Sequence, residues 1–259
     1  SDPKRSGELF QRVHEILNGM GIPVPEVIEV DDSKKIVSPE FMICSYVPGI
    51  DLDKIWDKLS KKEQENLTTK MGEILGKIHT IKFDKYGYLK TNGIWGGYKF
   101  LLKGKNKKKT PNPSSFSIIT QTLSDSGKLF VNKLVSLEKL NKIFNYLHKN
   151  QKLAESNEKP SLIHGDFDIL NIRVQKINKN LEIVCLLEFE YSASMPREYD
   201  FIKLHRRGFF DKKYLKKALL KGYLKYQKIP KDFEEKVKYM RITRDIAFAG
   251  VLFHSGDIN

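Results

Sequence analysis

The sequence has few cysteines, no long apolar run and no apolar leader. Two of its 259 residues are cysteine, Cys44 and Cys185, and each lies within an apolar stretch. We therefore expect small core residues in a reducing cytoplasm rather than a disulfide framework. No stretch approaches the roughly 20 apolar residues of a membrane helix, and the first six residues are polar, unlike a signal peptide. A cytoplasmic protein without a membrane partner is the expectation.

The charge is strongly unbalanced, with a formal net value of +14. Residues 1–100 balance 15 Lys/Arg against 15 Asp/Glu, so the excess begins at the lysine run of 103–109 and continues through the last third. Most of these lysines are scattered among helical positions, which indicates solvated helix faces. A surface that attracts anions, nucleotide phosphates included, is the alternative. Since aromatic and basic residues do not interleave as in a single-strand binding groove, this pattern does not favour a nucleic-acid partner.

Hydrophobic residues at 40% and charged residues at 30% are typical of a globular chain, long enough for two lobes around a shared core. Apolar periodicity predicts helices over about 8–19, 60–78, 128–150, 199–208, 212–227 and 231–252. Ser60 with Glu63 forms a capping box at the start of the second helix. Strands are expected at 27–30, 41–44, 172–174 and 181–189, the last two around a turn at 178–180, and a lysine-rich loop is expected at 103–115. The strand 41–44 is apolar throughout and is expected to be buried on both faces.

The most informative stretch runs from His164 to Asn171 and reads HGDFDILN. Asp166 and Asn171 stand five apart in a loop between strands, and Glu188 follows the next strand pair. One carboxylate can accept a proton from an attacking hydroxyl, while an amide oxygen and a second carboxylate suit Mg²⁺. Phosphoryl transfer needs these parts, because the nucleophile must be oriented and the phosphate charge neutralised.

These residues resemble the aminoglycoside phosphotransferase and choline kinase-like family, relatives of the protein kinases. The family's loop has His-Gly-Asp, four residues and Asn, which this chain matches in spacing. Further segments agree in order over about residues 8 to 205: IPVP at 22–25, FMICSYVPG at 41–49, LGKIH at 75–79, YGYL at 86–89 and EYDF at 198–201. The resemblance implies an α+β, kinase-like two-lobed fold with an abbreviated N-terminal lobe (1–48) and a mostly helical C-terminal lobe (49–259).

The resemblance also implies an activity, a phosphotransferase that moves the γ-phosphoryl group of ATP or GTP, with Mg²⁺, to a hydroxyl of a small molecule. The acceptor would be aminoglycoside-like, a sugar or an amino alcohol. Asp166 would be the catalytic base, and Asn171 and Glu188 the metal ligands. The nucleotide base would bond to backbone groups of Ser45 and Val47, with Cys44 at the back of its pocket.

Two departures from the family pattern keep an alternative open. The family's glycine-rich loop and strand lysine would lie before Ser1, and Glu8 is the candidate partner of that lysine. The family has aspartate where this chain has Glu188, one methylene longer, which predicts reduced activity or a changed metal preference. A catalytically weak or inactive kinase-fold nucleotide-binding protein is therefore the second hypothesis. A protein or nucleic-acid-associated kinase, drawn to anions by its lysines, is the third.

Other polar residues near these motifs receive structural expectations. His164 and His79 are expected to pack and brace rather than carry protons. Asp200 is expected to brace the catalytic loop through hydrogen bonds. Glu190 is expected to be structural, and Arg206 and Arg207 are expected on the surface.

Overall fold

The computed structural model describes residues 7–36, 41–84, 86–89, 127, 133–154 and 158–255. The chain divides into two compact units, one made of Ser1–Gly97 with Pro160–Ile229 and the other of Tyr98–Lys159 with Pro230–Asn259. Every residue that the sequence suggests for the site belongs to the first unit. The loop expected at 103–115 lies outside the described residues. The lobe boundary expected after residue 48 stays a prediction.

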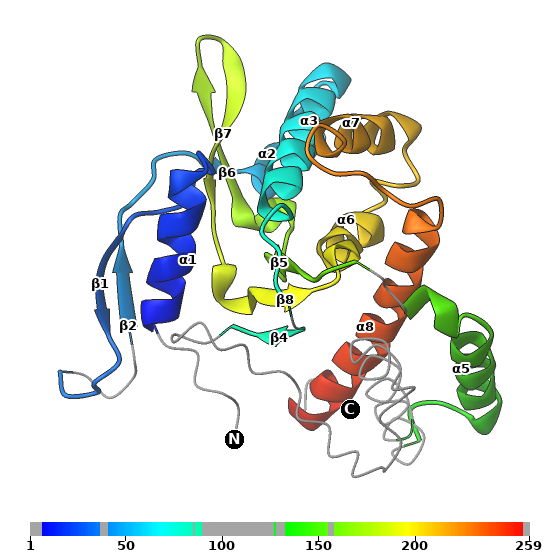
Figure 1. Cartoon of the computed structure of the whole chain (residues 1–259). Helices are drawn as coiled ribbons and strands as arrows, with labels where there is room; N and C mark the ends of the chain where they lie inside the picture. The colour runs from blue at the N-terminus through cyan, green and yellow to red at the C-terminus, as the bar shows by residue number, and fades with distance from the viewer. Residues whose placement is uncertain are drawn as a thin grey trace. The chain divides into compact units, whose positions relative to one another are not determined.

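The first unit opens with helix α1 (Gly7–Gly19) and a two-stranded antiparallel sheet of β1 (Val27–Asp31) and β2 (Phe41–Cys44) (Figure 1). These three elements were predicted. The burial of β2 on both faces was not correctly predicted, since Met42 and Ile43 are 37% and 49% exposed. An apolar run does not itself show which elements pack on its two faces. Within the described residues this sheet has two strands, and no third strand shields them.

Two further sheets hold the loop of interest. One has the order β3-β6-β7, formed by β3 (Ile50–Asp51), β6 (Ile172–Ile177) and β7 (Asn180–Leu186), and the other has the order β4-β8-β5, formed by β4 (Gly87–Tyr88), β8 (Ala193–Met195) and β5 (Ser161–Ile163). All their pairings are antiparallel. The chain passes from β5 in one sheet to β6 in the other, so the loop between them lies where the two sheets meet.

The predicted β6–β7 hairpin is confirmed, with one correction. Asn178 and Lys179 take positive φ angles of 48° and 69°, as tight hairpin turns require. The second strand was expected to reach Phe189 but ends at Leu186. Glu188 adopts a left-handed conformation, with φ 65° and ψ 53°, and a 3₁₀ helix follows at Phe189–Tyr191. The backbone therefore turns at the residue that the sequence marks as a metal ligand.

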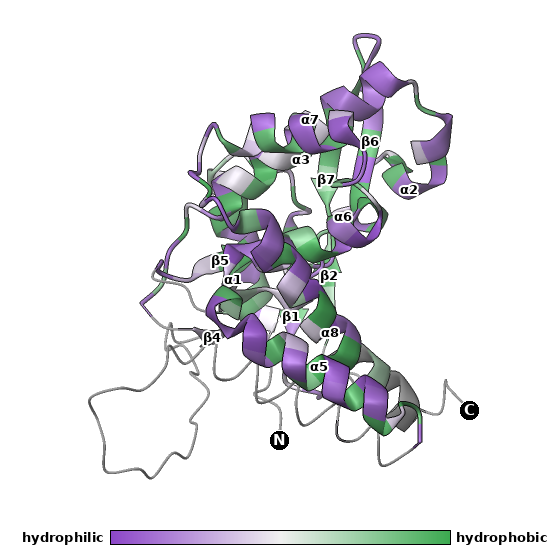
Figure 2. Cartoon of the chain, turned by 90° about the vertical axis from the view of Figure 1, so that its right-hand side faces the viewer, coloured by the Kyte–Doolittle hydropathy of each residue, from purple (hydrophilic) through white to green (hydrophobic). Residues whose placement is uncertain are grey.

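Two helices pack against each other and run side by side in Figures 1 and 2, α3 (Lys61–Ile78) and α7 (Lys213–Tyr223), and α3 also contacts β5 and β7. The capping box of α3 is present, since Ser60 Oγ accepts from the Glu63 amide and the Glu63 carboxylate accepts from the Ser60 amide. The helices touch at glycines. A Cβ added to Gly222 would lie 1.9 Å from the Thr69 carbonyl oxygen, so only glycine permits this approach.

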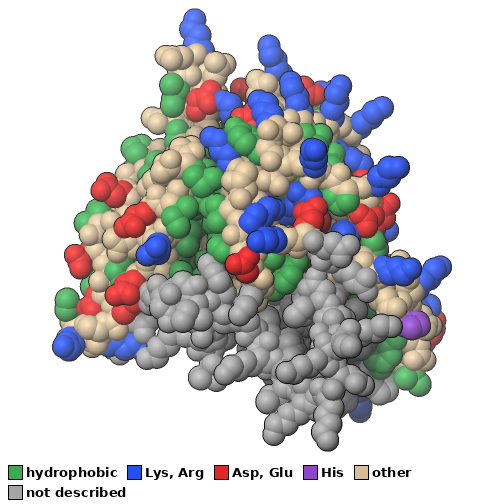
Figure 3. Space-filling model, viewed as in Figure 1, with side chains coloured by type: hydrophobic (Ala, Val, Ile, Leu, Met, Phe, Trp, Pro, Cys, Tyr) green, Lys and Arg blue, Asp and Glu red, His purple; other side chains and the backbone are tan. Residues whose placement is uncertain are grey.

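Short helices complete the first unit: α2 (Leu52–Ile55) with a 3₁₀ turn at Trp56–Lys58, 3₁₀ turns at Ile169–Asn171 and Arg197–Phe201, and α6 (Ile202–Arg206). The helix expected over 199–208 is thus part 3₁₀ and part α. Lysines of α7 such as Lys213, Lys217 and Lys221 are exposed. Figure 3 shows many Lys and Arg side chains over the region of α3 and α7. This agrees with solvated helix faces.

The second unit contains α5 (Leu137–Lys149), a 3₁₀ turn at Gln151–Ala154 and α8 (Phe233–Ser255). Leu147, Ala154 and Tyr239 form a small buried cluster, against which Tyr146 packs. Figure 2 shows hydrophilic and hydrophobic residues alternating along α5, the mark of a helix with one buried side. Among the described residues, no helix has the length and apolarity to cross a membrane.

Candidate active site

The loop from His164 to Asn171, hereafter the catalytic loop, is held at its start by hydrogen bonds to the side chain of Asp200. The Asp200 carboxylate accepts hydrogen bonds from the backbone amides of His164 (2.8 Å) and Gly165 (2.7 Å). Its Oδ2 lies 3.0 Å from His79 Nε2, and His79 Nδ1 lies 2.9 Å from the Tyr223 hydroxyl. All three side chains are buried, and burial raises the pKa of Tyr223. The bracing role expected of Asp200 thus has a definite form, a buried chain of hydrogen bonds from α7 to the catalytic loop.

His164 ties the catalytic loop to the end of β7. Its Nδ1 accepts from the Asp166 amide (3.2 Å), so its Nε2 carries the proton and donates to the Leu187 carbonyl (2.9 Å). Burial lowers the pKa of His164, and the ring contacts Phe189 with 4.3 Å between centroids. A neutral histidine with both nitrogens bonded braces the backbone, as expected from the sequence, and it sets the distance between Asp166 and the turn that carries Glu188.

Gly165 is required by the close approach of a neighbouring turn. Its φ is 82°, and a Cβ there would lie 2.1 Å from the Tyr191 carbonyl oxygen. Tyr191 belongs to the 3₁₀ helix that follows Glu188. The glycine of the His-Gly-Asp motif therefore lets the turn after Glu188 lie directly against the catalytic loop.

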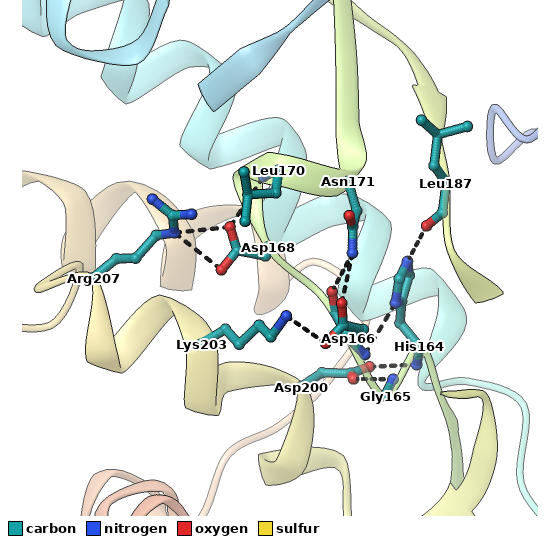
Figure 4. A network of polar contacts seen from close by, with 10 residues as sticks. All are labelled: His164, Gly165, Asp166, Asp168, Leu170, Asn171, Leu187, Asp200, Lys203 and Arg207. Atoms are coloured by element: carbon teal, nitrogen blue, oxygen red, sulfur yellow. Dashed lines mark hydrogen bonds and ion pairs between the residues drawn. The ribbon is translucent and has the colours of Figure 1, made fainter. Parts of the chain in front are cut away.

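Asp166 and Asn171 are joined directly (Figure 4). The Asn171 side-chain amide donates to the Asp166 carbonyl (2.9 Å) and to Asp166 Oδ2 (2.8 Å). The other carboxylate oxygen, Oδ1, lies 2.5 Å from Lys203 Nζ of α6. The Leu187 amide donates to the Asn171 carbonyl (2.9 Å), which brings the residue before Glu188 alongside Asn171. Asp166 and Asn171, which the sequence singled out, thus lie in direct contact, the backbone next to Glu188 lies alongside them, and a lysine that the sequence did not single out joins Asp166.

A second ionic group lies on the other side of the catalytic loop. Asp168, whose side chain is 5% exposed, accepts from the Leu170 amide and pairs with Arg207 Nε at 2.8 Å. Arg207 Nη1 also reaches Asp53 of α2 at 3.2 Å. Arg207 was expected on the surface and is exposed there, and its side chain also forms part of an ion-pair network. Its guanidinium joins the catalytic loop to α2 and to the end of α6.

Glu188 and Glu190 form a carboxyl pair beside Asp166. Glu188 is exposed and left-handed, a conformation that a non-glycine residue adopts at a cost of about 1 kcal/mol or more. Burial, followed by the hydrogen bond that a protonated Glu190 donates to the Glu188 carboxylate, raises the pKa of Glu190 to about 7, and the negative charge of Asp166 acts in the same direction. Three carboxyl groups therefore crowd one region, an arrangement that a cation would relieve.

The oxygen ligands available here suit a magnesium ion that is also bound by nucleotide phosphates better than one held by protein groups alone. The Asn171 amide nitrogen is engaged with Asp166, which leaves Oδ1 without a donor among the described residues. No group of three or more His, Cys, Asp or Glu side chains within the described ranges is arranged to hold a metal by itself. Mg²⁺ in proteins usually takes one or two carboxylates and completes its shell with phosphates and water. Asn171 and Glu188 offer oxygen ligands of the type that such an ion takes.

The residues expected to contact the nucleotide base, Cys44, Ser45 and Val47, differ in the backbone groups that they can offer to it. The Ser45 amide donates to the Glu26 carbonyl (2.8 Å), and Ser45 Oγ accepts from the Glu26 amide (2.9 Å). The Ser45 amide is therefore already bonded to Glu26, the residue before β1, and the Ser45 carbonyl is the backbone group that can bond to a nucleotide base. Val47 makes no hydrogen bond within the part of the chain that the structure describes. Burial raises the pKa of the Cys44 thiol, in agreement with an apolar lining residue.

A cavity of about 760 Å³ lies between α1 and the start of β1. It is lined by side chains from α1, by Val24, Glu26 and Val27, and by Ser45. None of the catalytic-loop residues lines it. This cavity therefore reaches Ser45 but not the described residues of the catalytic loop.

The sequence contained a signal for Lys203 that was missed. Asp200 and Lys203 stand three apart at the junction of a 3₁₀ turn and a helix, where residues at that spacing project to the same side. Since Asp200 anchors the catalytic loop, a cation one turn later could reach Asp166. For Arg207 no sequence pattern marked the distant Asp53 as a partner.

Comparison with known proteins decides the family. A family model described as the phosphotransferase enzyme family matches residues 1–231. The chain belongs to that family. The resemblance drawn from the His-Gly-Asp motif is thereby confirmed. No curated protein matches this phosphotransferase-family chain in sequence.

Solved structures confirm the fold of this phosphotransferase-family chain. It superposes on the GDP complex of wild-type aminoglycoside 2'-phosphotransferase-IIIa with a TM-score of 0.67 at 12% identity, covering 96% of this chain and 76% of that one. For the streptomycin-ATP-APH(2")-IIa ternary complex the TM-score is 0.59 at 17% identity, with coverages of 97% and 75%. ADP-bound aminoglycoside phosphotransferase APH(2'')-Ib gives 0.57 at 17%, with coverages of 95% and 77%. The expected α+β, protein-kinase-like fold is confirmed.

Proposed function

We propose that this protein transfers the γ-phosphoryl group of ATP or GTP to a hydroxyl group of a small molecule. The observation that carries the proposal is the direct bond between Asp166 and Asn171. The backbone bond from Leu187 to Asn171 supports a position for the next residue, Glu188, near that pair. Family membership supports the reaction class. The proteins of similar fold include complexes with GDP, ATP and ADP and with aminoglycosides, which supports a nucleotide donor and a hydroxylated acceptor.

Asp166 acts as the base in this proposal. The acceptor oxygen bonds to the γ-phosphorus as its proton passes to the carboxylate, and the nucleoside diphosphate leaves. Asn171 holds Asp166 through Oδ2 and the carbonyl and keeps its own Oδ1 for the metal. Asn171 Oδ1 and Glu188 would hold Mg²⁺, which would neutralise the charge of the phosphates. Cys44, the Ser45 carbonyl and the Val47 backbone take the nucleotide base.

The longer side chain of Glu188 favours the second hypothesis, a weak or inactive kinase-fold nucleotide-binding protein. Magnesium tolerates misplaced ligands badly. The carboxyl–carboxyl contact between Glu188 and Glu190 also means that one of them must turn away, or lose a proton, when a cation binds. A protein of this kind would bind nucleotide with little dependence on metal and would transfer nothing.

The test is phosphoryl transfer from γ-labelled ATP and GTP, each with Mg²⁺, to a panel of aminoglycosides, sugars and amino alcohols. Asp166→Asn keeps the shape of the side chain and removes the base, so transfer should fall by about 10²-fold or more. Asp57→Asn is the matched control, because Asp57 is an exposed aspartate of the same unit. Labelled product with wild type and the control, but not with Asp166→Asn, supports the proposal. A complete lack of transfer to every acceptor overturns it.

A further inference from the structure

Lys203 occupies a place in the site that the proposed roles do not use. Figure 4 shows its side chain reaching from α6 toward Asp166, where Nζ lies 2.5 Å from Oδ1. The two side chains are 22% and 17% exposed, so the contact is largely shielded from water without being sealed. With Asn171 on Oδ2, both oxygens of the proposed base already have a donor before any substrate arrives.

The backbone of Lys203 is held in place, whereas its side-chain ammonium can move. α6 begins two residues after Asp200, whose carboxylate is bonded to the backbone of the catalytic loop. The backbone of Lys203 is therefore held to the catalytic loop through a buried contact. A lysine carries three donors on a flexible four-carbon stem, so its ammonium can change partners while the backbone stays in place.

The neighbouring cation is held more firmly. Arg207 pairs with Asp168 on one side and with Asp53 on the other, and Asp168 is nearly buried. Moving that guanidinium would leave two carboxylates without their partner, one of them buried, which is costly. Lys203 pairs instead with Asp166, a carboxylate that the reaction itself engages. Lys203 is therefore better suited than Arg207 to move toward the negative charge that develops during the reaction.

We propose that Lys203 is a catalytic cation of the phosphoryl transfer, whose ammonium passes from Asp166 to the oxygens of the transferring phosphoryl group; this rests on the proposed function. The acceptor oxygen forms its bond to the γ-phosphorus, the bond from that phosphorus to the bridging oxygen breaks, and the nucleoside diphosphate carries away the electron pair. The hydroxyl proton goes to Asp166 Oδ1, the oxygen that Lys203 vacates. A positioned cation at developing phosphoryl charge is a standard source of rate.

The resting contact has a second consequence. While Lys203 covers Oδ1 of Asp166, a water molecule cannot use that oxygen as its base. Nucleotide hydrolysis without acceptor is therefore restrained, and removal of the ammonium should lower transfer far more than hydrolysis. A lysine that merely neutralises a half-buried carboxylate would leave the ratio of transfer to hydrolysis unchanged, so the two roles are separable.

The experiment compares wild type with Lys203→Met, Lys203→Arg and the control Lys225→Met. Lys225 is matched because it also forms a 2.5 Å ion pair, with Glu73, in the same unit and away from the catalytic loop. Three quantities are measured: kcat for transfer, the rate of hydrolysis without acceptor, and the affinity for nucleoside diphosphate with Mg²⁺, alone and with aluminium fluoride, a mimic of the transferring phosphoryl group. Lys203→Gln, which keeps a polar side chain, is measured in the same way in case Lys203→Met does not fold.

The expected result is a loss of about 100-fold in kcat for Lys203→Met and a comparable loss of affinity for the aluminium fluoride complex, with diphosphate affinity nearly unchanged. Lys203→Arg should recover part of both losses, and Lys225→Met should match wild type. Equal kcat and equal aluminium fluoride affinity in wild type and Lys203→Met would overturn the role of Lys203 while leaving the proposed function standing. Absence of transfer and of nucleotide binding in wild type would overturn both.

Discussion

His79 and Asp200 lie 121 residues apart in the chain, and their side chains meet in the interior with 3.0 Å between Nε2 and Oδ2. The same carboxylate accepts from the amides of His164 and Gly165. Because His79 ends α3 and also bonds to Tyr223 of α7, the conformation of the catalytic loop is set by the packing of these two helices. Stability and activity should therefore be lost together when this chain of bonds is cut.

Asp200→Asn tests that coupling. The amide replaces an oxygen acceptor with an NH₂ group that faces the N–H donors of the catalytic loop, so one buried donor loses its partner. We expect a loss of about 2–4 kcal/mol in the free energy of unfolding, measured by urea denaturation, and a fall in kcat. Asp57→Asn, at an exposed site, should change stability by less than about 0.5 kcal/mol. An Asp200→Asn variant as stable as this control would refute the coupling.

Gly165→Ala tests the contact between the catalytic loop and the turn after Glu188. The added Cβ would meet the Tyr191 carbonyl at 2.1 Å, and the residue has φ 82°. We expect unfolding free energy to fall by about 2 kcal/mol or more and activity to be largely lost. Gly19→Ala is the control, since nothing lies within 4 Å of a Cβ there. Equal effects of the two substitutions on activity would show that the close approach is unimportant.

The neutral state of His164 predicts a pH dependence of stability. Burial lowers its pKa in the folded protein below the ordinary value of 6.5. Between the two values the unfolded chain binds a proton that the folded chain does not, so stability is highest above about pH 6.5 and falls as the pH drops below it. The slope is at most about 1.4 kcal/mol per pH unit for one such group.

Urea unfolding of wild type and His164→Gln between pH 7.5 and 5 measures that slope. His14, whose pKa is also lowered by burial, contributes in the same direction to both proteins, so the difference between them isolates His164. The variant should be less stable at pH 7.5 and should lose less stability on acidification. Identical slopes would mean that the pKa of His164 is the same in the folded and the unfolded chain, which contradicts the buried, neutral ring.

Arg207→Ala tests the ion-pair network on the other side of the catalytic loop. It leaves the nearly buried Asp168 carboxylate without its cation, and we expect a loss of about 2–4 kcal/mol in the free energy of unfolding. Arg206→Ala alters the exposed neighbour and should cost less than about 0.5 kcal/mol. The comparison is made by thermal or urea unfolding at neutral pH. A cost for Arg207→Ala no larger than that of its neighbour would mean that Asp168 tolerates isolation.

Local sequence patterns predicted most of the fold. The apolar spacing of α3 and its Ser60–Glu63 capping box, the apolar stripe of α1, and the Asn178–Lys179 turn each follow from interactions within a few residues, which a sequence displays directly. The errors arose where distant structure decides. The exposure of Ile43 depends on which strands lie nearby, and the end of β7 at Leu186 depends on the left-handed turn at Glu188.

The site shows the same division. The spacing of Asp166 and Asn171 within one loop is a local property, and the structure joins the two side chains directly. Lys203 and Arg207 form ion pairs with residues more than 30 positions earlier in the chain. These pairs depend on the contact between Asp200 and the catalytic loop, which local sequence patterns do not show. The hydrogen bond from the Ser45 amide to Glu26 likewise depends on the pairing of distant strands. Because it joins backbone groups, the side chains in the sequence give no sign of it.

Metal-dependent nucleotide binding is the most direct test of a single site formed by Asp166, Asn171 and Glu188. Titration calorimetry with non-hydrolysable ATP and GTP analogues, in Mg²⁺ and in EDTA, compares wild type with Glu188→Gln and with Glu188→Asp. We predict that Mg²⁺ tightens binding to wild type by about tenfold or more, that Glu188→Gln loses this gain, and that Glu188→Asp keeps it. Equal affinity of wild type in Mg²⁺ and EDTA, or a full magnesium effect in Glu188→Gln, would contradict the account.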